Sequence, residues 1–155
     1  MKAIETALSL TQAYKLGIER FEKMLGDEFS KAIELMNKTN EHIIICGMGK
    51  SGLVGRKISS TLASTGTPSI FLHPAEAIHG DLGKVQKKSI VLLISYSGET
   101  EEIIALIPAF KRLNVTIVAL TGVKDSTLAS KADIILDTSV DREACPLNLA
   151  PTLLQ

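Results

Sequence analysis

The sequence contains no tryptophan, and aromatic residues make up only 4% of its 155 residues. It also lacks an excess of either charge, because 17 lysines and arginines balance 17 aspartates and glutamates. Proteins that bind nucleic acids or anionic membranes normally carry a basic excess, so we expect neither partner. A net charge near zero favours self-association instead, and we expect a homo-oligomer, either a dimer or a tetramer.

Cysteine is also scarce, and its spacing predicts neither a disulfide framework nor a metal site. Cys46 and Cys145 lie far apart, and Cys46 belongs to an apolar run that is typical of a buried strand. This usage suits a reducing compartment, so we expect a cytoplasmic protein. The N-terminus has no apolar signal region, and the apolar stretch 90–94 is far too short to cross a membrane.

The chain changes its hydrophobic pattern near residue 41. Before that point apolar residues recur with a helical period, and Gly26-Asp27 is predicted to separate two helices, with Asp27 as the N-cap. After it, short apolar runs alternate with helical stretches, which is typical of a parallel sheet covered on both faces. The predicted strands are 42–46, 69–72, 90–95, 115–120 and 134–136, and the predicted helices between them are 51–64, 99–113 and 127–131.

We therefore expect an α/β fold with a doubly wound five-stranded parallel sheet and a site at the carboxyl ends of the strands. A single domain is expected, with an N-terminal helical segment at 1–40 and a core at 41–155. The sequence contains no internal repeat, low-complexity tract or linker. No amphipathic helix is predicted after the last strand, so we expect an apolar face to be left for a partner chain.

A first glycine loop (residues 47–52, Gly-Met-Gly-Lys-Ser-Gly) follows the first predicted strand and opens a helix. Glycines let the backbone approach an oxyanion, and the N–H groups at a helix start donate hydrogen bonds to it. A P-loop would need glycine in place of Ile44, and a dinucleotide fingerprint would need an acid near Leu72, where none stands. A tight turn without a ligand is the remaining alternative.

A second glycine loop (residues 95–100, Ser-Tyr-Ser-Gly-Glu-Thr) has the same position after another buried strand. Hydroxyls both donate and accept hydrogen bonds, so they suit a phosphate monoester. Helix capping by Ser97 would explain one hydroxyl but not three. The two loops together predict a phosphate site, and its candidate residues are Gly49, Ser51, Gly52, Ser95, Ser97, Gly98 and Thr100.

The two glycine loops are part of a resemblance that covers nearly the whole chain. It also includes four further segments, 63–68, 73–77, 79–83 and 143–147. Together they resemble the SIS (sugar isomerase) domain of bacterial arabinose-5-phosphate isomerases. The resemblance implies a flavodoxin-like fold and interconversion of D-arabinose 5-phosphate and D-ribulose 5-phosphate, the entry to the eight-carbon acid sugar of lipopolysaccharide or capsule. It also implies that the hydroxyls of both loops hold the phosphate. The isomerisation requires no metal in principle, and we expect no cofactor.

An aldose–ketose isomerase needs a base for the carbon-bound proton and groups that move hydroxyl protons. Glu102 is a candidate, because with Glu99 it extends the apolar stripe of its predicted helix toward the ligand end. The resemblance places a catalytic glutamate at Glu143. Lys50 would polarise the sugar carbonyl or balance the phosphate charge, and His79 would contact a sugar hydroxyl or move a proton.

Three alternatives stay open at this stage. The spacing His73-x-x-Glu76-x-x-His79 permits an adventitious zinc site in a predicted loop, although a fourth ligand is not evident. A nicotinamide-dependent oxidoreductase has little support. A non-catalytic phosphosugar-binding SIS module is the main alternative, since the resemblance usually continues into a long helix, a His-Pro-Gly segment and often a pair of regulatory domains, none of which this sequence contains.

Overall fold

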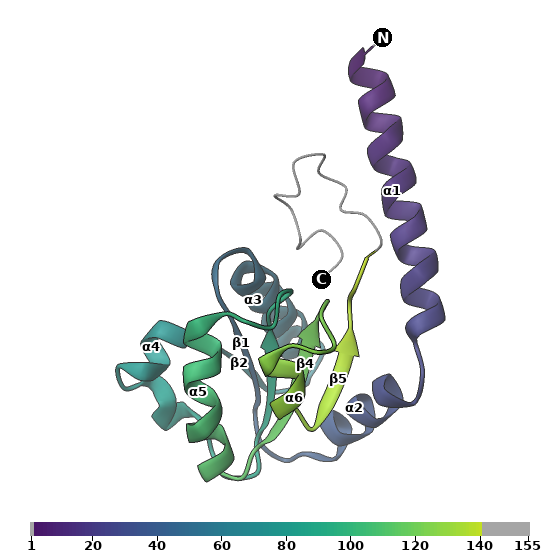
Figure 1. The fold of residues 1–155 in the computed structure, drawn as a ribbon. Coiled ribbons are helices and arrows are strands. Elements are labelled where there is room, and N and C mark those ends of the chain that lie inside the picture. Colours follow the sequence, from purple (N-terminus) through teal and green to yellow (C-terminus); the bar gives the residue numbers. More distant parts are fainter. Residues whose placement is uncertain (1, 141–155) are drawn as a thin grey trace.

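One parallel sheet forms the centre of the computed structural model, which describes residues 2–140 (Figure 1). The strands run in the order β2-β1-β3-β4-β5, and all neighbours are parallel. This is the strand order of flavodoxin-like, doubly wound sheets, so the predicted fold class is confirmed. The strands are β1 Ile43–Gly47, β2 Ser69–Leu72, β3 Ile90–Ile94, β4 Thr116–Thr121 and β5 Ile134–Asp137.

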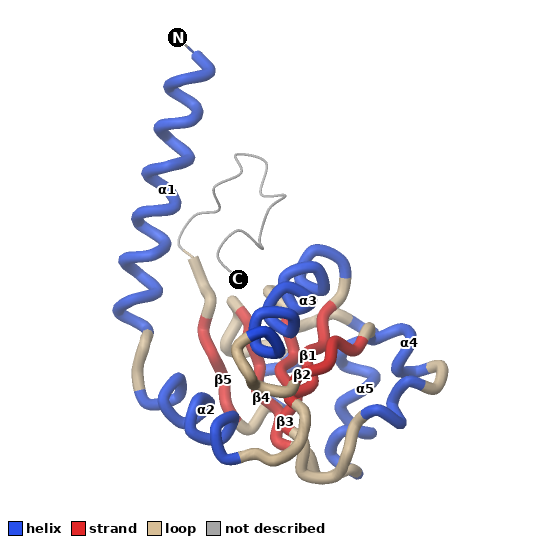
Figure 2. Tube along the Cα trace, turned by 180° about the vertical axis from the view of Figure 1, so that it is seen from behind, coloured by secondary structure: helices blue, strands red, loops and turns tan. Residues whose placement is uncertain are grey.

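Helices cover both faces of the sheet, as Figure 1 and the reverse view in Figure 2 show. Helices α2 and α3 pack on one face, and α4, α5 and α6 pack on the other. Each face has its own hydrophobic cluster, because successive strand residues point to opposite sides. The helices are α1 Lys2–Met24, α2 Asp27–Lys38, α3 Gly49–Ser64, α4 Pro74–Ile78, α5 Glu101–Arg112 and α6 Thr127–Lys131.

Strand β1 illustrates why these residues form a central strand. All five of its residues are buried, with Ile43 and Ile45 in one cluster and Ile44 and Cys46 in the other. A strand covered on both faces has no solvent side, which explains its continuous apolar sequence. Burial raises the pKa of the Cys46 thiol to about 12, so the expected core position of this cysteine is confirmed.

Two details of the helices differ from expectation. Gly26 is the N-cap of α2, and Asp27 lies in the first turn, where an acid interacts favourably with the helix dipole. The segment between β2 and β3 was expected to be a loop, but it contains α4 and a 3₁₀ helix at Asp81–Lys84. Pro74 at the first helical position was the signal for α4, since its fixed φ suits a helix start.

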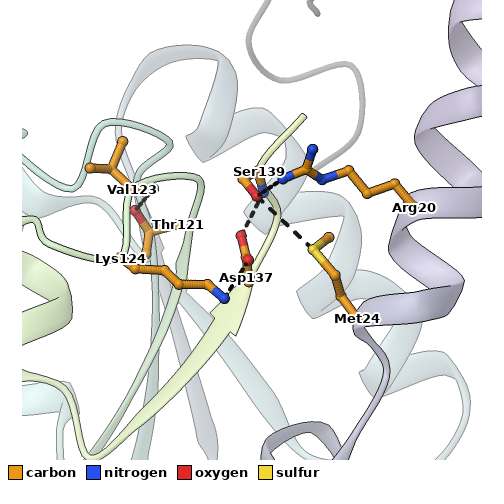
Figure 3. Close-up of polar contacts among 7 residues, drawn as sticks. All are labelled: Arg20, Met24, Thr121, Val123, Lys124, Asp137 and Ser139. Carbon is orange, nitrogen blue, oxygen red and sulfur yellow. Dashed lines mark hydrogen bonds and ion pairs between the residues drawn. The ribbon is translucent and has the colours of Figure 1, made fainter. Parts of the chain in front are cut away.

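Helix α1 extends away from the sheet, and Gly17 is the residue of this helix classed as buried. Its C-terminal end is joined to the segment after β5, where Arg20 Nη2 donates to Ser139 Oγ at 3.0 Å (Figure 3). Within residues 2–140, no helix is both long and apolar enough to span a membrane. The expected lack of a helix after the last strand concerns residues 141–155, which lie outside the described part of the chain.

Candidate functional site

The two glycine loops leave the sheet side by side. They follow β1 and β3, which are neighbours in the sheet, and Gly47 pairs with Ile94 at the point where both strands end. From β1 the chain winds outward to β2, and from β3 it winds in the opposite direction to β4. Ligands of doubly wound folds bind in the crevice at such a reversal point, so the expected position of both loops at one sheet edge is confirmed.

The first glycine loop brings the start of α3 very close to β1. A Cβ atom at Gly52 would lie 2.6 Å from the carbonyl oxygen of Gly47, so only glycine fits there without moving the backbone. Gly49 has a φ of 55°, in the left-handed region. Lys50 is exposed and Ser51 is half-buried, and both lie in the first turn of α3. The positive end of the α3 dipole therefore faces this edge of the sheet.

The second glycine loop gathers its hydroxyls around a buried serine. Ser95 is 2% exposed, and its Oγ lies 2.8 Å from Thr100 Oγ1 and accepts a hydrogen bond from Gly98 N at 3.1 Å. Ser97 is exposed, and its Oγ accepts from Glu99 N at 3.2 Å. Thr100 is the N-cap of α5 but its side chain forms no capping bond. Capping therefore does not account for this hydroxyl.

Gly98 is the residue of the second glycine loop at which Ser126, beside the start of α6, leaves no room for a side chain. Its φ is 66°, and a Cβ atom built on it would overlap the side chain of Ser126. Ser126 is itself the N-cap of α6, where its Oγ accepts from Ala129 N at 3.3 Å. The Gly98 carbonyl oxygen accepts from Leu128 N at 3.0 Å. Gly98 is thus required both by the backbone conformation and by the closeness of α6.

The charged candidates come from three different elements. Glu102 is half-buried in the first turn of α5, whereas its neighbour Glu101 is exposed. Lys50 comes from α3, and His79 is the exposed C-cap residue of α4. Helices α3, α4 and α5 each begin after a strand, which places their N-termini at the carboxyl edge. Glu143 lies outside the described residues.

Glu99 occupies a different place from the one expected. It precedes α5 instead of belonging to the inner stripe of that helix, and its Oε1 accepts a hydrogen bond from Thr127 N at 2.6 Å. Its sequence neighbours provide no signal for this contact, because Thr127 lies 28 residues further along the chain. This interaction joins the second glycine loop to the first residue of α6.

The end of β4 and the loop that follows it contact the second glycine loop through hydrogen bonds. Thr121 Oγ1 donates to Tyr96 O at 3.1 Å, and Gly122 N donates to the same oxygen at 2.9 Å. On the other side of this loop, Lys124 Nζ lies 2.9 Å from an Asp137 carboxylate oxygen at the end of β5. The second glycine loop is therefore linked to both β4 and α6.

Asp137 is ionised under ordinary conditions. Partial burial raises the pKa of its carboxyl, but hydrogen bonds from the Ser139 backbone, Lys124 and the Ser139 hydroxyl, together with the Lys124 charge, outweigh this effect and lower the pKa overall. The carboxylate thus connects Lys124 with Ser139, which also contacts Arg20 and Met24 of α1.

A metal site at the two histidines has no geometric support. In the part of the chain that the structure describes, no three His, Cys, Asp or Glu side chains lie close enough together to hold a metal ion. His73 precedes α4 and His79 follows it, so the helix separates them. The His73 Nδ1 atom is buried without a hydrogen-bond partner.

A doubly wound sheet with two loops rich in glycine and hydroxyl groups at its reversal point defines an α/β domain suited to binding a phosphate ester. The model of the SIS domain family matches residues 35–154. The chain therefore belongs to the SIS domain family, and the resemblance inferred from its sequence motifs is confirmed.

Proteins of known activity are similar to this chain. Arabinose 5-phosphate isomerase KdsD of Pseudomonas aeruginosa is 56% identical over 128 residues, which are 83% of this chain and 39% of that protein. Arabinose 5-phosphate isomerase KpsF of Escherichia coli O6:H1 is 52% identical over 125 residues, which are 81% of this chain and 38% of that protein. The chain therefore spans well under half the length of these curated relatives.

A solved structure supports the same relationship. A protein of Escherichia coli CFT073, solved in complex with a phosphosugar, superposes with a TM-score of 0.86 at 37% identity. The superposition covers 97% of this chain and 80% of that chain. The fold predicted from sequence and the fold of this relative are therefore the same over the described strands and helices.

Proposed function

We propose that this chain binds pentose 5-phosphates and interconverts D-arabinose 5-phosphate and D-ribulose 5-phosphate, in the synthesis of lipopolysaccharide or capsule sugars. The observation that carries the proposal is the pair of glycine loops at the reversal point of the sheet, in a chain 56% identical to an arabinose 5-phosphate isomerase. A cytoplasmic location forms part of the proposal, because the buried Cys46 is a free thiol.

In this proposal the phosphate lies between the starts of α3 and α5. The first loop supplies Ser51 and backbone N–H groups at the start of α3, where Gly49 and Gly52 let the backbone approach the phosphate closely. The second loop supplies the hydroxyls of Ser95, Ser97 and Thr100. Donors at a helix start and neutral hydroxyls hold a phosphate dianion without a metal ion. Gly98 shapes the second loop and brings its hydroxyls together.

The proton transfers would use the charged candidates Lys50, His79, Glu102 and Glu143. A carboxylate, Glu102 or Glu143, removes the proton from C2 of the aldose while the C1 carbonyl oxygen gains a proton, which produces an enediol. Return of a proton to C1 and loss of the O2 proton gives the ketose. Lys50 would stabilise the developing oxyanion, and His79 would move a hydroxyl proton.

A thermal-shift experiment tests binding directly. Ribulose 5-phosphate at about 100 times its Kd should raise the melting temperature of the chain by about 5 °C or more, because a ligand that binds only the native state stabilises it. NADH at the same concentration should have no effect and serves as the control. Stabilisation by NADH alone would contradict the proposed ligand class.

An isomerase assay separates the two functions that remain. The chain should form arabinose 5-phosphate from ribulose 5-phosphate in the absence of any added metal ion. Binding without turnover would refute the isomerase proposal and favour the non-catalytic phosphosugar-binding module.

Homo-oligomer formation is also part of the proposal. Helix α1 carries apolar side chains that are 41% to 68% exposed and lie on one side of the helix, namely Ile4, Leu8, Ile18 and Phe21. Light scattering should give a mass of two or four chains, and the pair Leu8→Glu and Ile18→Glu should shift it to one chain. Ser9→Glu, on the opposite side of α1, is the matched control, and a monomeric wild type would contradict this part of the proposal.

We also propose that residues 1–40 form one domain with the core. Helix α2 buries Ala32 in the cluster that includes Ile45 and Val118, and α1 is joined to the sheet edge through Arg20 and Ser139.

A further inference from the structure

Two successive residues of α6 contact two successive residues of the second glycine loop. Thr127 N donates to Glu99 Oε1 at 2.6 Å, and Leu128 N donates to Gly98 O at 3.0 Å. Backbone amides at a helix start have no partner within the helix, so they bind whatever acceptor lies nearest. Here both acceptors belong to the loop that carries the phosphate-site hydroxyls. The start of α6 therefore acts as a fixed support for that loop.

The acid at position 99 needs an explanation, since a carboxylate beside a phosphate site would repel the ligand. Glu99 is exposed, so packing in the core does not explain it. Its hydrogen bond from Thr127 N, at 2.6 Å, directs the carboxylate toward α6. The backbone N–H of the same residue donates to Ser97 Oγ. Glu99 thus connects α6 with one of the candidate phosphate-binding hydroxyls.

We propose that Glu99 is a positioning residue, which holds the second glycine loop in its ligand-binding shape by accepting the hydrogen bond from Thr127 N. This inference rests on the proposed function, because it assigns Glu99 a part in phosphosugar binding without contact to the ligand. Without this hydrogen bond, residues 97–99 are less restrained in the free protein. Ordering them around a phosphate then costs conformational entropy, which lowers the affinity for the ligand. Leu128 N still holds Gly98 O, so the loop is loosened but not detached.

The chain offers changes on both sides of this hydrogen bond. Glu99→Ala removes the acceptor, whereas Glu99→Gln keeps a neutral oxygen acceptor at the same place. Thr127→Pro removes the donor, and proline is tolerated there because Thr127 is the first residue of α6 and Ser126 before it is extended, with φ −74° and ψ 162°. Glu101→Ala is the matched control, since Glu101 is an exposed acid in the first turn of α5.

The measurement is calorimetric titration of each variant of the 155-residue chain with arabinose 5-phosphate and, separately, with inorganic phosphate. Glu99→Ala and Thr127→Pro should each weaken both affinities about fivefold, as expected for one lost hydrogen bond to a charged group. Their combination should weaken them no further, because both remove the same interaction. Glu99→Gln should recover most of the affinity, and Glu101→Ala should match the wild type.

Different failures have different meanings. Wild-type protein that binds neither probe would contradict the proposed function itself. If the wild type binds and Glu99→Ala binds with the same affinity, only the positioning role is overturned. The same holds if Glu99→Gln binds as weakly as Glu99→Ala. A purely structural role would lower the melting temperature of ligand-free Glu99→Ala and leave the affinity of its folded fraction unchanged. If Thr127→Pro does not fold, the two Glu99 variants decide the question by themselves.

Discussion

Replacement of Gly98 by alanine is expected to abolish measurable binding of arabinose 5-phosphate and to destabilise the chain by about 3 kcal/mol. The backbone at this residue has a φ of 66°, which an alanine adopts only with strain. The added Cβ would also overlap Ser126, the N-cap of α6. Relief requires either the loop to move, which disturbs the contact between Ser95 and Thr100, or α6 to move, which breaks its hydrogen bonds to Gly98 and Glu99. Denaturant unfolding and calorimetric titration measure the two effects.

Two further variants show whether the overlap between the added Cβ atom and Ser126 causes the loss of stability. Gly83→Ala is the control, because a Cβ atom there has no heavy atom within 4 Å, and the expected change in stability is within about 0.5 kcal/mol. Ser126→Gly in the Gly98→Ala background removes the overlapping side chain and should restore part of the lost stability. Glycine is an acceptable N-cap, so this second change costs only a few tenths of a kcal/mol. Wild-type affinity in Gly98→Ala would disprove this account of the loop.

Replacement of Glu102 by glutamine is expected to lower kcat for the isomerisation by about 10²- to 10⁴-fold, the usual contribution of a general base. The substitution keeps the size of the side chain and removes its ability to accept a proton. Affinity for arabinose 5-phosphate should remain within about twofold, since in the proposed site the phosphate contacts come from other residues and would supply most of the binding energy. Steady-state kinetics and calorimetry measure these quantities separately.

The adjacent acid provides the comparison. Glu101→Gln makes the same chemical change one residue earlier in α5, at an exposed side chain, and should leave kcat unchanged. Equal rates in Glu102→Gln and wild type would exclude Glu102 as the base and leave Glu143 as the remaining carboxylate candidate. A Glu102→Gln variant that loses affinity and rate together would indicate a binding role instead.

The strands were predictable because each is built on a continuous apolar run that is bounded by glycine or polar residues. Strand β1 was expected at 42–46 and lies at Ile43–Gly47, a shift of one residue. The alternation of strands with helices then determined the parallel sheet and placed both glycine loops at one edge. The short α4 was missed because five residues provide too little helical periodicity to recognise.

The contacts of the second glycine loop were not predictable in the same way. The hydrogen bond between Glu99 and Thr127 joins residues from two separate βα units, and helical periodicity assigned Glu99 to a helix that it in fact precedes. The closeness of Gly98 to Ser126 depends on how α6 packs against the second glycine loop. Such distances depend on the packing of layers, which no local sequence pattern encodes.

The pairing of β1 with β3 has a consequence for how the chain folds. These strands are adjacent in the sheet, but α3, β2 and α4 lie between them in the sequence. Because this pairing is non-local, we expect it to form late in folding. The two glycine loops do not lie side by side until β1 and β3 have paired. A phosphosugar should therefore slow unfolding without accelerating refolding, because the state it recognises forms only after the rate-limiting barrier.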